Sequence, residues 1–167
     1  MIALNLLEIK DFMNKLLCSE TFDNFLLREA AIQSSVTWSL DGSLNADFYS
    51  NEELETGGLV GLPFLPFGNI RPQCFDLIKG KRTPTYFKFV FLLSPANLTR
   101  TLEQTKSSFT PEDITGMFLN LKFQHGKLLL TTGISYRTFS ADKSLEGEWD
   151  QLVKRFLKNH AIVFEEL

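Results

Sequence analysis

The stretch MFLNLKFQHGKLLLTTGISYRTF, residues 117–139, decides the fold class of this 167-residue chain. Apolar, aromatic or β-branched residues occupy every second position over residues 119–123 and again over residues 128–138. The turn Gln124-His125-Gly126 separates the two segments. A period of two is typical of β-strands with one buried face. We therefore expect two antiparallel strands joined by a short turn, the first of them beginning near Ile114.

The segment before this pair, residues 86–93, predicts a further strand. Three phenylalanines alternate along it, and its other face is also largely apolar. A strand that is apolar on both faces belongs in the middle of a sheet. Ser94-Pro95 follows, and this pair fits the N-cap and the first position of a helix. We expect that helix to extend to about Lys106.

The N-terminal part of the chain gives a similar order of signals. Residues 2–7 predict a short strand, and residues 9–17 carry apolar side chains at the spacing of one helix face. Alternation returns over residues 32–40 and again over residues 44–48. The pair Asp41-Gly42 lies between them and is typical of a two-residue turn. We therefore expect a β-hairpin around Asp41-Gly42.

The middle and the end of the chain follow other patterns. Residues 51–69 start with an acidic run and contain four glycines and two prolines, which predicts a long loop. A short helix is expected from about Pro72 to Gly80. Residues 144–159 give the clearest amphipathic helix, and residues 162–164 fit a short edge strand. The fold class is therefore α+β.

The order of elements repeats once within what we expect to be a single domain, residues 1–167. The units 1–50 and 85–140 both run through strand, helix, strand and strand, with residues 51–84 between them. This order resembles the domain of DNA sliding clamps, in which two strand–helix–sheet units are related by a pseudo-twofold axis. By that resemblance the helices at 9–17 and 95–106 would face DNA, although they carry few cations.

Three longer stretches resemble an uncharacterised family of small cytosolic proteins from anaerobic Gram-positive bacteria. They are DFMNKLLCSETFDNFLL (residues 11–27), RPQCFDLIKGKRTP (residues 71–84) and WDQLVKRFLKNH (residues 149–160). That family has no assigned activity. The resemblance therefore implies a bacterial, cytosolic protein and supplies no catalytic residues.

Composition limits the class of protein. Hydrophobic residues make up 44% of the chain and charged residues 22%, which is ordinary for a globular domain and unlike a disordered one. The net charge of −3 gives no overall attraction to phosphate. The two cysteines, Cys18 and Cys74, lie in apolar segments and fit reduced thiols. Without a signal peptide or an apolar membrane span, we expect a cytoplasmic protein with no membrane partner.

The usual catalytic motifs are missing. Gly80-Lys81 is neither preceded nor followed by the residues that a phosphate-binding P-loop needs. The two histidines, His125 and His160, have no Cys, Asp or Glu at ligand spacing. A cysteine among apolar residues usually behaves as a small hydrophobe. We therefore expect no catalytic residue, no metal and no cofactor, and the protein is more readily a non-catalytic binding module than an enzyme.

The densest group of cations consists of Arg71, Lys79, Lys81 and Arg82. Such a group either solubilises the end of a helix and a turn, or contacts a phosphate or an acidic partner. The second interpretation makes these four residues candidates for binding nucleic acid or an acidic protein that works with it.

The apolar run Phe64, Leu65 and Phe67 lies within the loop over residues 57–68. It either folds back as a lid on the core or remains exposed as a site for a protein partner. Two other hypotheses use the same loop. In one, a small-ligand or enzyme pocket lies beneath it. In the other, the protein is a homo-oligomer that uses the loop as its interface.

Overall fold

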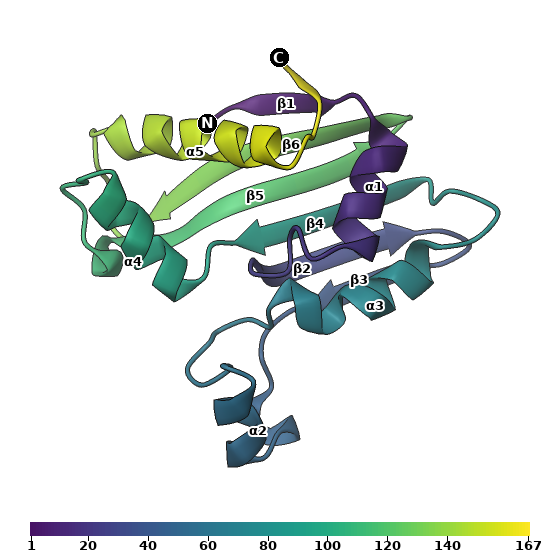
Figure 1. Ribbon diagram of the computed structural model, residues 1–167, viewed down its shortest axis with the longest axis horizontal. Helices are drawn as coiled ribbons and strands as arrows, with labels where there is room; N and C mark the ends of the chain where they lie inside the picture. Colours follow the sequence, from purple (N-terminus) through teal and green to yellow (C-terminus); the bar gives the residue numbers. More distant parts are fainter.

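The computed structural model describes all 167 residues and contains one seven-stranded sheet (Figure 1). The strands are β1 (Ala3–Leu6), β2 (Leu26–Gln33), β3 (Thr37–Asp41), β4 (Tyr86–Leu92), β5 (Ile114–Gln124), β6 (Lys127–Tyr136) and β7 (Phe164–Glu166). Their order across the sheet is β3-β2-β4-β5-β6-β1-β7, and every neighbouring pair is antiparallel. The predicted α+β class and the central position of β4 are confirmed.

The helices lie mainly on one face of this sheet. They are α1 (Ile9–Cys18), α2 (Asn51–Thr56), α3 (Phe67–Ile78), α4 (Pro95–Gln104) and α5 (Ser144–Asn159), with 3₁₀ turns at Ala46–Phe48 and Pro111–Asp113. Figure 1 shows α1, α3 and α5 across one face, α4 at one end of the sheet and α2 away from it. The predicted C-terminal helix over 144–159 is confirmed. No helix is both long and apolar enough to cross a membrane.

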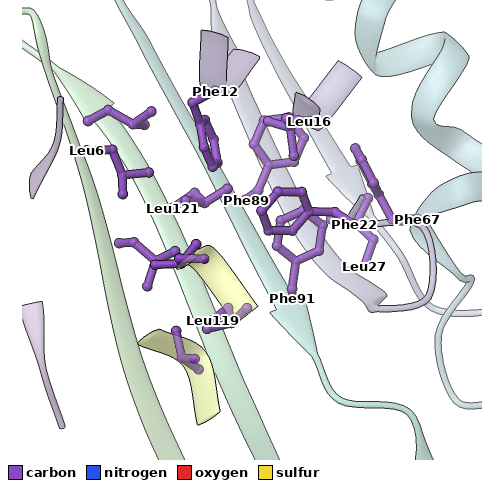
Figure 2. Close-up of a cluster of buried hydrophobic side chains, with 14 of the residues drawn as sticks. Leu6, Phe12, Leu16, Phe22, Leu27, Phe67, Phe89, Phe91, Leu119 and Leu121 are labelled. Carbon is purple, nitrogen blue, oxygen red and sulfur yellow. The ribbon is translucent and has the colours of Figure 1, made fainter. Parts of the chain in front are cut away.

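The core lies between the sheet and these helices. Alternate residues of β4, namely Phe87, Phe89 and Phe91, face the helices and are at most 2% exposed. Figure 2 shows Phe12 and Leu16 of α1 pointing onto the same layer, where the aromatic rings gather. Full burial of one such side chain stabilises the fold by about 1.5–3 kcal/mol. The phenylalanine-rich core therefore holds the sheet to one helical layer.

No helix covers the opposite face of β4, β5 and β6, which we call the open face. The side chains on it follow from the register, because cross-strand partners point to the same side of a sheet. Lys88 of β4 pairs with Lys122 of β5, and the next pairs along the strands are Val90 with Asn120 and Leu92 with Phe118. The open face is therefore a mixture of cations, polar groups, one aromatic ring and the buried aliphatic side chains of Val90 and Leu92.

The hairpin predicted at Asp41-Gly42 is wrong. The chain turns instead at residues 34–36, where the Ser34 amide donates to the Val36 carbonyl (2.9 Å). Residues 44–48 contain a 3₁₀ turn and no strand. The alternation of apolar residues could not locate the turn. Across a connection of three residues, even-numbered side chains remain on the same face of the sheet, so the alternation continues through the turn without a break.

Gly42 has a different role from the one its turn signal indicated. Its amide donates to the Arg28 carbonyl (2.8 Å), so the chain passes very close to β2. A Cβ atom at this position would lie 1.7 Å from the carbonyl oxygen of Leu27. Only glycine permits this approach, and that is why glycine follows Asp41.

Residues 51–69 were predicted to form a long loop, but they contain the helix α2 and the start of α3. The helix α2 starts after Ser50, whose hydroxyl accepts from the Glu53 amide (3.1 Å) while the Glu53 carboxylate accepts from the Ser50 amide. This reciprocal capping box holds a helix of only six residues. The helix α3 starts at Phe67, before the predicted start, so Pro72 lies inside it and removes one helical hydrogen bond.

The strand pairs β2–β3 and β5–β6 each follow a strand and a helix in the chain, although the first pair turns at residues 34–36 and not at Asp41-Gly42. The helix that packs against α1 is α3. Figure 1 shows α4, the second helix of the repeat, at the other end of the sheet. A clamp-like architecture therefore remains a prediction.

Candidate nucleic-acid interface

Three central strands bring lysines together on the open face. Lys88 and Lys122 are direct cross-strand partners, and Lys127 pairs with Gln124 at the neighbouring end of β5. The strands β4, β5 and β6 contain no Asp or Glu. Like charges directly opposite each other weaken a strand pair. The stability of the sheet does not explain this arrangement, whereas an anionic ligand would.

Most of this positive charge is free of internal partners. Lys88 pairs with Glu29 (Nζ to Oε1, 3.3 Å), and both side chains are substantially exposed. Exposed pairs of this kind contribute only about 0–1 kcal/mol, so a ligand can displace the carboxylate at little cost. Lys122 and Lys127 are exposed and form no ion pair.

The structure separates the four cations that the sequence grouped. Arg71 is directed inward, where its Nε donates to an Asp23 carboxylate oxygen (2.8 Å) and its Nη1 to the Leu17 carbonyl (3.3 Å). The hydrogen bond to Asp23 raises the pKa of Arg71 above its ordinary value. Lys79 pairs with Asp76 (3.0 Å). Arg71 is therefore a structural residue and is not placed to meet a ligand.

Lys81 and Arg82 remain exposed in the turn that leads into β4. Tyr86, the first residue of β4, pairs with Gln124 at the end of β5. The turn therefore lies at the same end of the sheet as Lys122 and Lys127. We define the basic end as five cations: Lys81, Arg82, Lys88, Lys122 and Lys127.

Sequence reasoning identified the first two members of the basic end and missed the three lysines on the strands. Lys88, Lys122 and Lys127 are isolated in the sequence, and only the register of the sheet brings them together. A signal was present, because these lysines are the only charged residues in three strands without a carboxylate.

Two adjoining grooves cross the open face. The first, of about 360 Å³, is lined by Arg28, Lys88, Phe118 and Lys122 among others, and Glu29 is its one carboxylate. The second, of about 600 Å³, shares Arg28, Glu29 and Lys88, continues over β3 to Phe64 and adds the carboxylate of Asp41. Cations therefore predominate in the first groove, whereas the second groove is lined by two cations and two carboxylates.

The predicted apolar patch does not gather on the surface. Phe67 is fully buried, with its ring centroid 5.0 Å from that of Phe91. Leu65 is half-buried, and its backbone forms hydrogen bonds with Leu27 and Gly42 (2.9 Å each). Phe64 is half-buried and lines the second groove. The end of this loop is therefore fastened to the sheet edge through Leu65 and to the core through Phe67.

Residues 44–62 extend away from the sheet with α2 (Figure 1). They contain four carboxylates, on Asp47, Glu52, Glu53 and Glu55, and no Lys or Arg. Phe48 is 79% exposed on this segment. We call it the acidic arm. It carries the opposite charge to the basic end.

Side chains suited to catalysis do not converge. A groove of about 320 Å³ lies beside Leu65 and the acidic arm, where Asp41 and Tyr49 are its ionisable groups. Hydrogen bonds from Ser43 lower the pKa of Asp41. Burial raises the pKa of the Cys74 thiol to about 12, so it is not a nucleophile at neutral pH. No group of three or more His, Cys, Asp or Glu side chains is placed to hold a metal ion.

A separate groove of about 270 Å³ lies on the helical side, between α4, α5 and the loop after α1. Its walls are largely apolar and include Phe25, Trp149 and Phe156, and its lining also includes Asn24 and Asn97. No charged side chain lines it. It fits the small-ligand hypothesis better than the surface beneath the 57–68 loop, and its ligand would be small and uncharged.

Comparison with known proteins gives a family and no function. Residues 15–165 match the model of a family of unknown function, DUF5721. No curated protein and no solved structure matches the chain. The expectation of a family without an assigned activity is confirmed, and the choice of function depends on the surface of this molecule.

Proposed function

The chain belongs to DUF5721, a family of unknown function, and we propose that it is a non-catalytic module that binds nucleic acid through its basic end. The pairing of Lys88 with Lys122, on strands without a carboxylate, carries the proposal. A phosphate backbone would neutralise both ammonium groups at once, and the release of condensed counterions would favour binding.

The distribution of charge supports this ligand over an acidic small molecule. The five cations of the basic end follow the end of the sheet from the turn before β4 to the start of β6. A repeating anion can contact several of them together, whereas a single phosphate can contact only the nearest. The unpaired thiols Cys18 and Cys74 agree with an intracellular location, where such a ligand is found.

The resemblance to DNA sliding clamps supports this proposal only in that clamps also bind nucleic acid. In a clamp the helices face the DNA, whereas the cations that we propose for binding lie on the open face of the sheet and in the turn that leads into β4. A small uncharged ligand in the groove beside Trp149 is the second candidate, because that groove combines apolar walls with two asparagines. Binding of such a ligand would not account for the direct pairing of Lys88 with Lys122.

The test is a titration of labelled single-stranded and duplex DNA at several salt concentrations, followed by fluorescence anisotropy. We expect saturable binding that weakens as salt rises. The variant Lys122→Gln/Lys127→Gln should bind several-fold more weakly and show a smaller salt slope, by about 0.7–0.9 for each phosphate that it no longer neutralises.

The matched control is Lys10→Gln/Lys158→Gln, which removes the same charge from two exposed lysines of the helical layer. It should bind like the unaltered protein. Absence of salt-dependent binding, or an equal loss in both variants, would reject the basic end as the site. Quenching of Trp149 by a neutral aromatic compound, without DNA binding, would favour the second candidate.

A further inference from the structure

We infer that the groove beyond the basic end holds unpaired bases, so that the ligand is single-stranded nucleic acid in preference to duplex. This inference rests on the proposed function and adds the class of strand that is bound. It is carried by three neighbouring residues of the open face: Arg28, Phe118 and Gly133.

Gly133 leaves a bare area on β6, just beyond the last residue that pairs with β1. It is the cross-strand partner of Phe118, and a Cβ atom built on it would meet no atom within 4 Å. Its φ angle does not lie in the left-handed region. Neither crowding nor backbone conformation requires glycine here, and glycine weakens the interior of a strand. A glycine at such a position often marks a place where another molecule approaches the backbone.

Phe118 is the cross-strand neighbour of this bare area, and its ring lies over Gly116 of the same strand, where a Cβ atom would be 2.9 Å from the ring. It is half-buried, and the Arg28 guanidinium lies 5.6 Å from the ring centroid. Arg28 comes from the irregular point of β2 between Leu27 and Glu29, and it forms no ion pair. An aromatic ring accepts a base by stacking, and a guanidinium accepts either a base plane or a phosphate.

Different kinds of side chain follow one another along the groove, in the direction of the strands. Lys122 and Phe118 are four residues apart on the same face of β5, a separation of roughly 13 Å. Asn120 lies between them and pairs with Thr131 of β6, which places an amide and a hydroxyl in the middle. A chain that crosses this surface meets cations first, then hydrogen-bonding groups and then the ring.

This order fits a single strand better than a duplex. A duplex keeps its bases stacked inside the helix, so it offers phosphates to the lysines and nothing to Phe118. A single strand can place its phosphates on Lys88 and Lys122 and lay a base on the ring. Sheet surfaces with exposed aromatic rings recognise single strands in this way. The same geometry offers little to a protein partner, because hydrogen-bonding and charged groups interrupt the apolar area.

The decisive variant adds a side chain. Gly133→Val should fold at least as well as the unaltered protein, because valine favours strands and the surrounding space is empty. Its two methyl groups would cover the bare area beside Phe118. We expect it to bind a labelled oligo-dT of roughly 12 nucleotides about tenfold more weakly. Binding to a duplex of the same length should stay unchanged.

The control is Gly147→Ala, which fills an equally empty position on α5, in the helical layer. It should bind the oligo-dT like the unaltered protein. A second variant, Phe118→Ala, removes the ring and should also weaken single-strand binding about tenfold. Thermal melting verifies the fold of each variant.

The outcomes separate the inference from the proposed function. Equal affinity for single strand and duplex, with no effect of Gly133→Val or Phe118→Ala, overturns the inference. If Lys122→Gln/Lys127→Gln still weakens binding in that case, the proposed function stands. If the protein binds neither the single strand nor the duplex, both the inference and the proposed function are wrong.

Discussion

Arg71 was predicted from the sequence to bind an anionic partner, but in the structure its side chain forms hydrogen bonds within the protein. Its guanidinium joins α3 to the last turn of α1 through the Leu17 carbonyl and to the segment after α1 through Asp23. Both members of the ion pair are about four-fifths shielded, with 21% and 19% of their side chains exposed. At this degree of burial a charged hydrogen bond contributes more than a surface ion pair does.

We predict that Arg71→Ala lowers the free energy of unfolding by about 2 kcal/mol, because Asp23 and the Leu17 carbonyl lose their donor. Urea denaturation measures the change. Arg71→Lys should restore little of the loss, since an ammonium group cannot reproduce the fork of contacts. Nucleic-acid affinity of the folded variant should be unchanged. A stable Arg71→Ala protein that no longer binds would assign Arg71 to the interface after all.

At the scale of elements, the start of α5 depends on one carboxylate. Oδ1 of Asp142 accepts a hydrogen bond from the Ser144 amide (2.9 Å) at the N-terminus of the helix. Hydrogen bonds from Ser144, chiefly from its backbone amide, lower the pKa of Asp142 below its ordinary 3.8. The contribution to stability is therefore present above pH 3.8 and is lost as the pH falls through the lower, folded-state pKa.

We predict that the first turn of α5 loosens only in acid, below pH 3.8. The amide shift of Ser144, followed by NMR against pH, should titrate with a midpoint below that value. In Asp142→Asn the same amide should lose this titration. A midpoint at or above 3.8 in the unaltered protein would contradict the role of the carboxylate.

Elements with strong local signals could be predicted from the sequence. The period of β5 and β6, the Ser94-Pro95 start of α4 and the apolar stripe of α5 each depend on residues close together in the chain. The turn at residues 34–36 and the close passage of Gly42 depend on how β2 pairs with its neighbours. The helix α2 had a readable signal in Ser50 and Glu53, which the glycines and prolines after it obscured.

The candidate site could be predicted only in part, because some of its residues are distant in the sequence and come together only through strand pairing. Lys81 and Arg82 are neighbours in the sequence, so their charge density is visible without a structure. The pairing of Lys88 with Lys122 needs the register between β4 and β5. The bare area at Gly133 needs the register between β5 and β6.

At the scale of the whole molecule, charge is divided between two regions. The chain carries a net charge of −3, yet the basic end contributes five cations and the acidic arm four carboxylates with no cation. If the protein binds nucleic acid as proposed, we expect the basic end to attract the ligand and the acidic arm to repel it, which would orient the ligand before contact. Under this proposal the acidic arm would direct the ligand to the open face without contacting it.

The most direct test of nucleic-acid binding on the open face is an NMR map of the amides that shift when a short oligo-dT is added. The shifts should gather on β4, β5 and β6, around Lys88, Lys122 and Gly133, and at the turn that holds Lys81 and Arg82. The amides of α1 and α5 should remain in place. Shifts confined to the helical layer or to the acidic arm, or no shift at low salt, would contradict the proposed function.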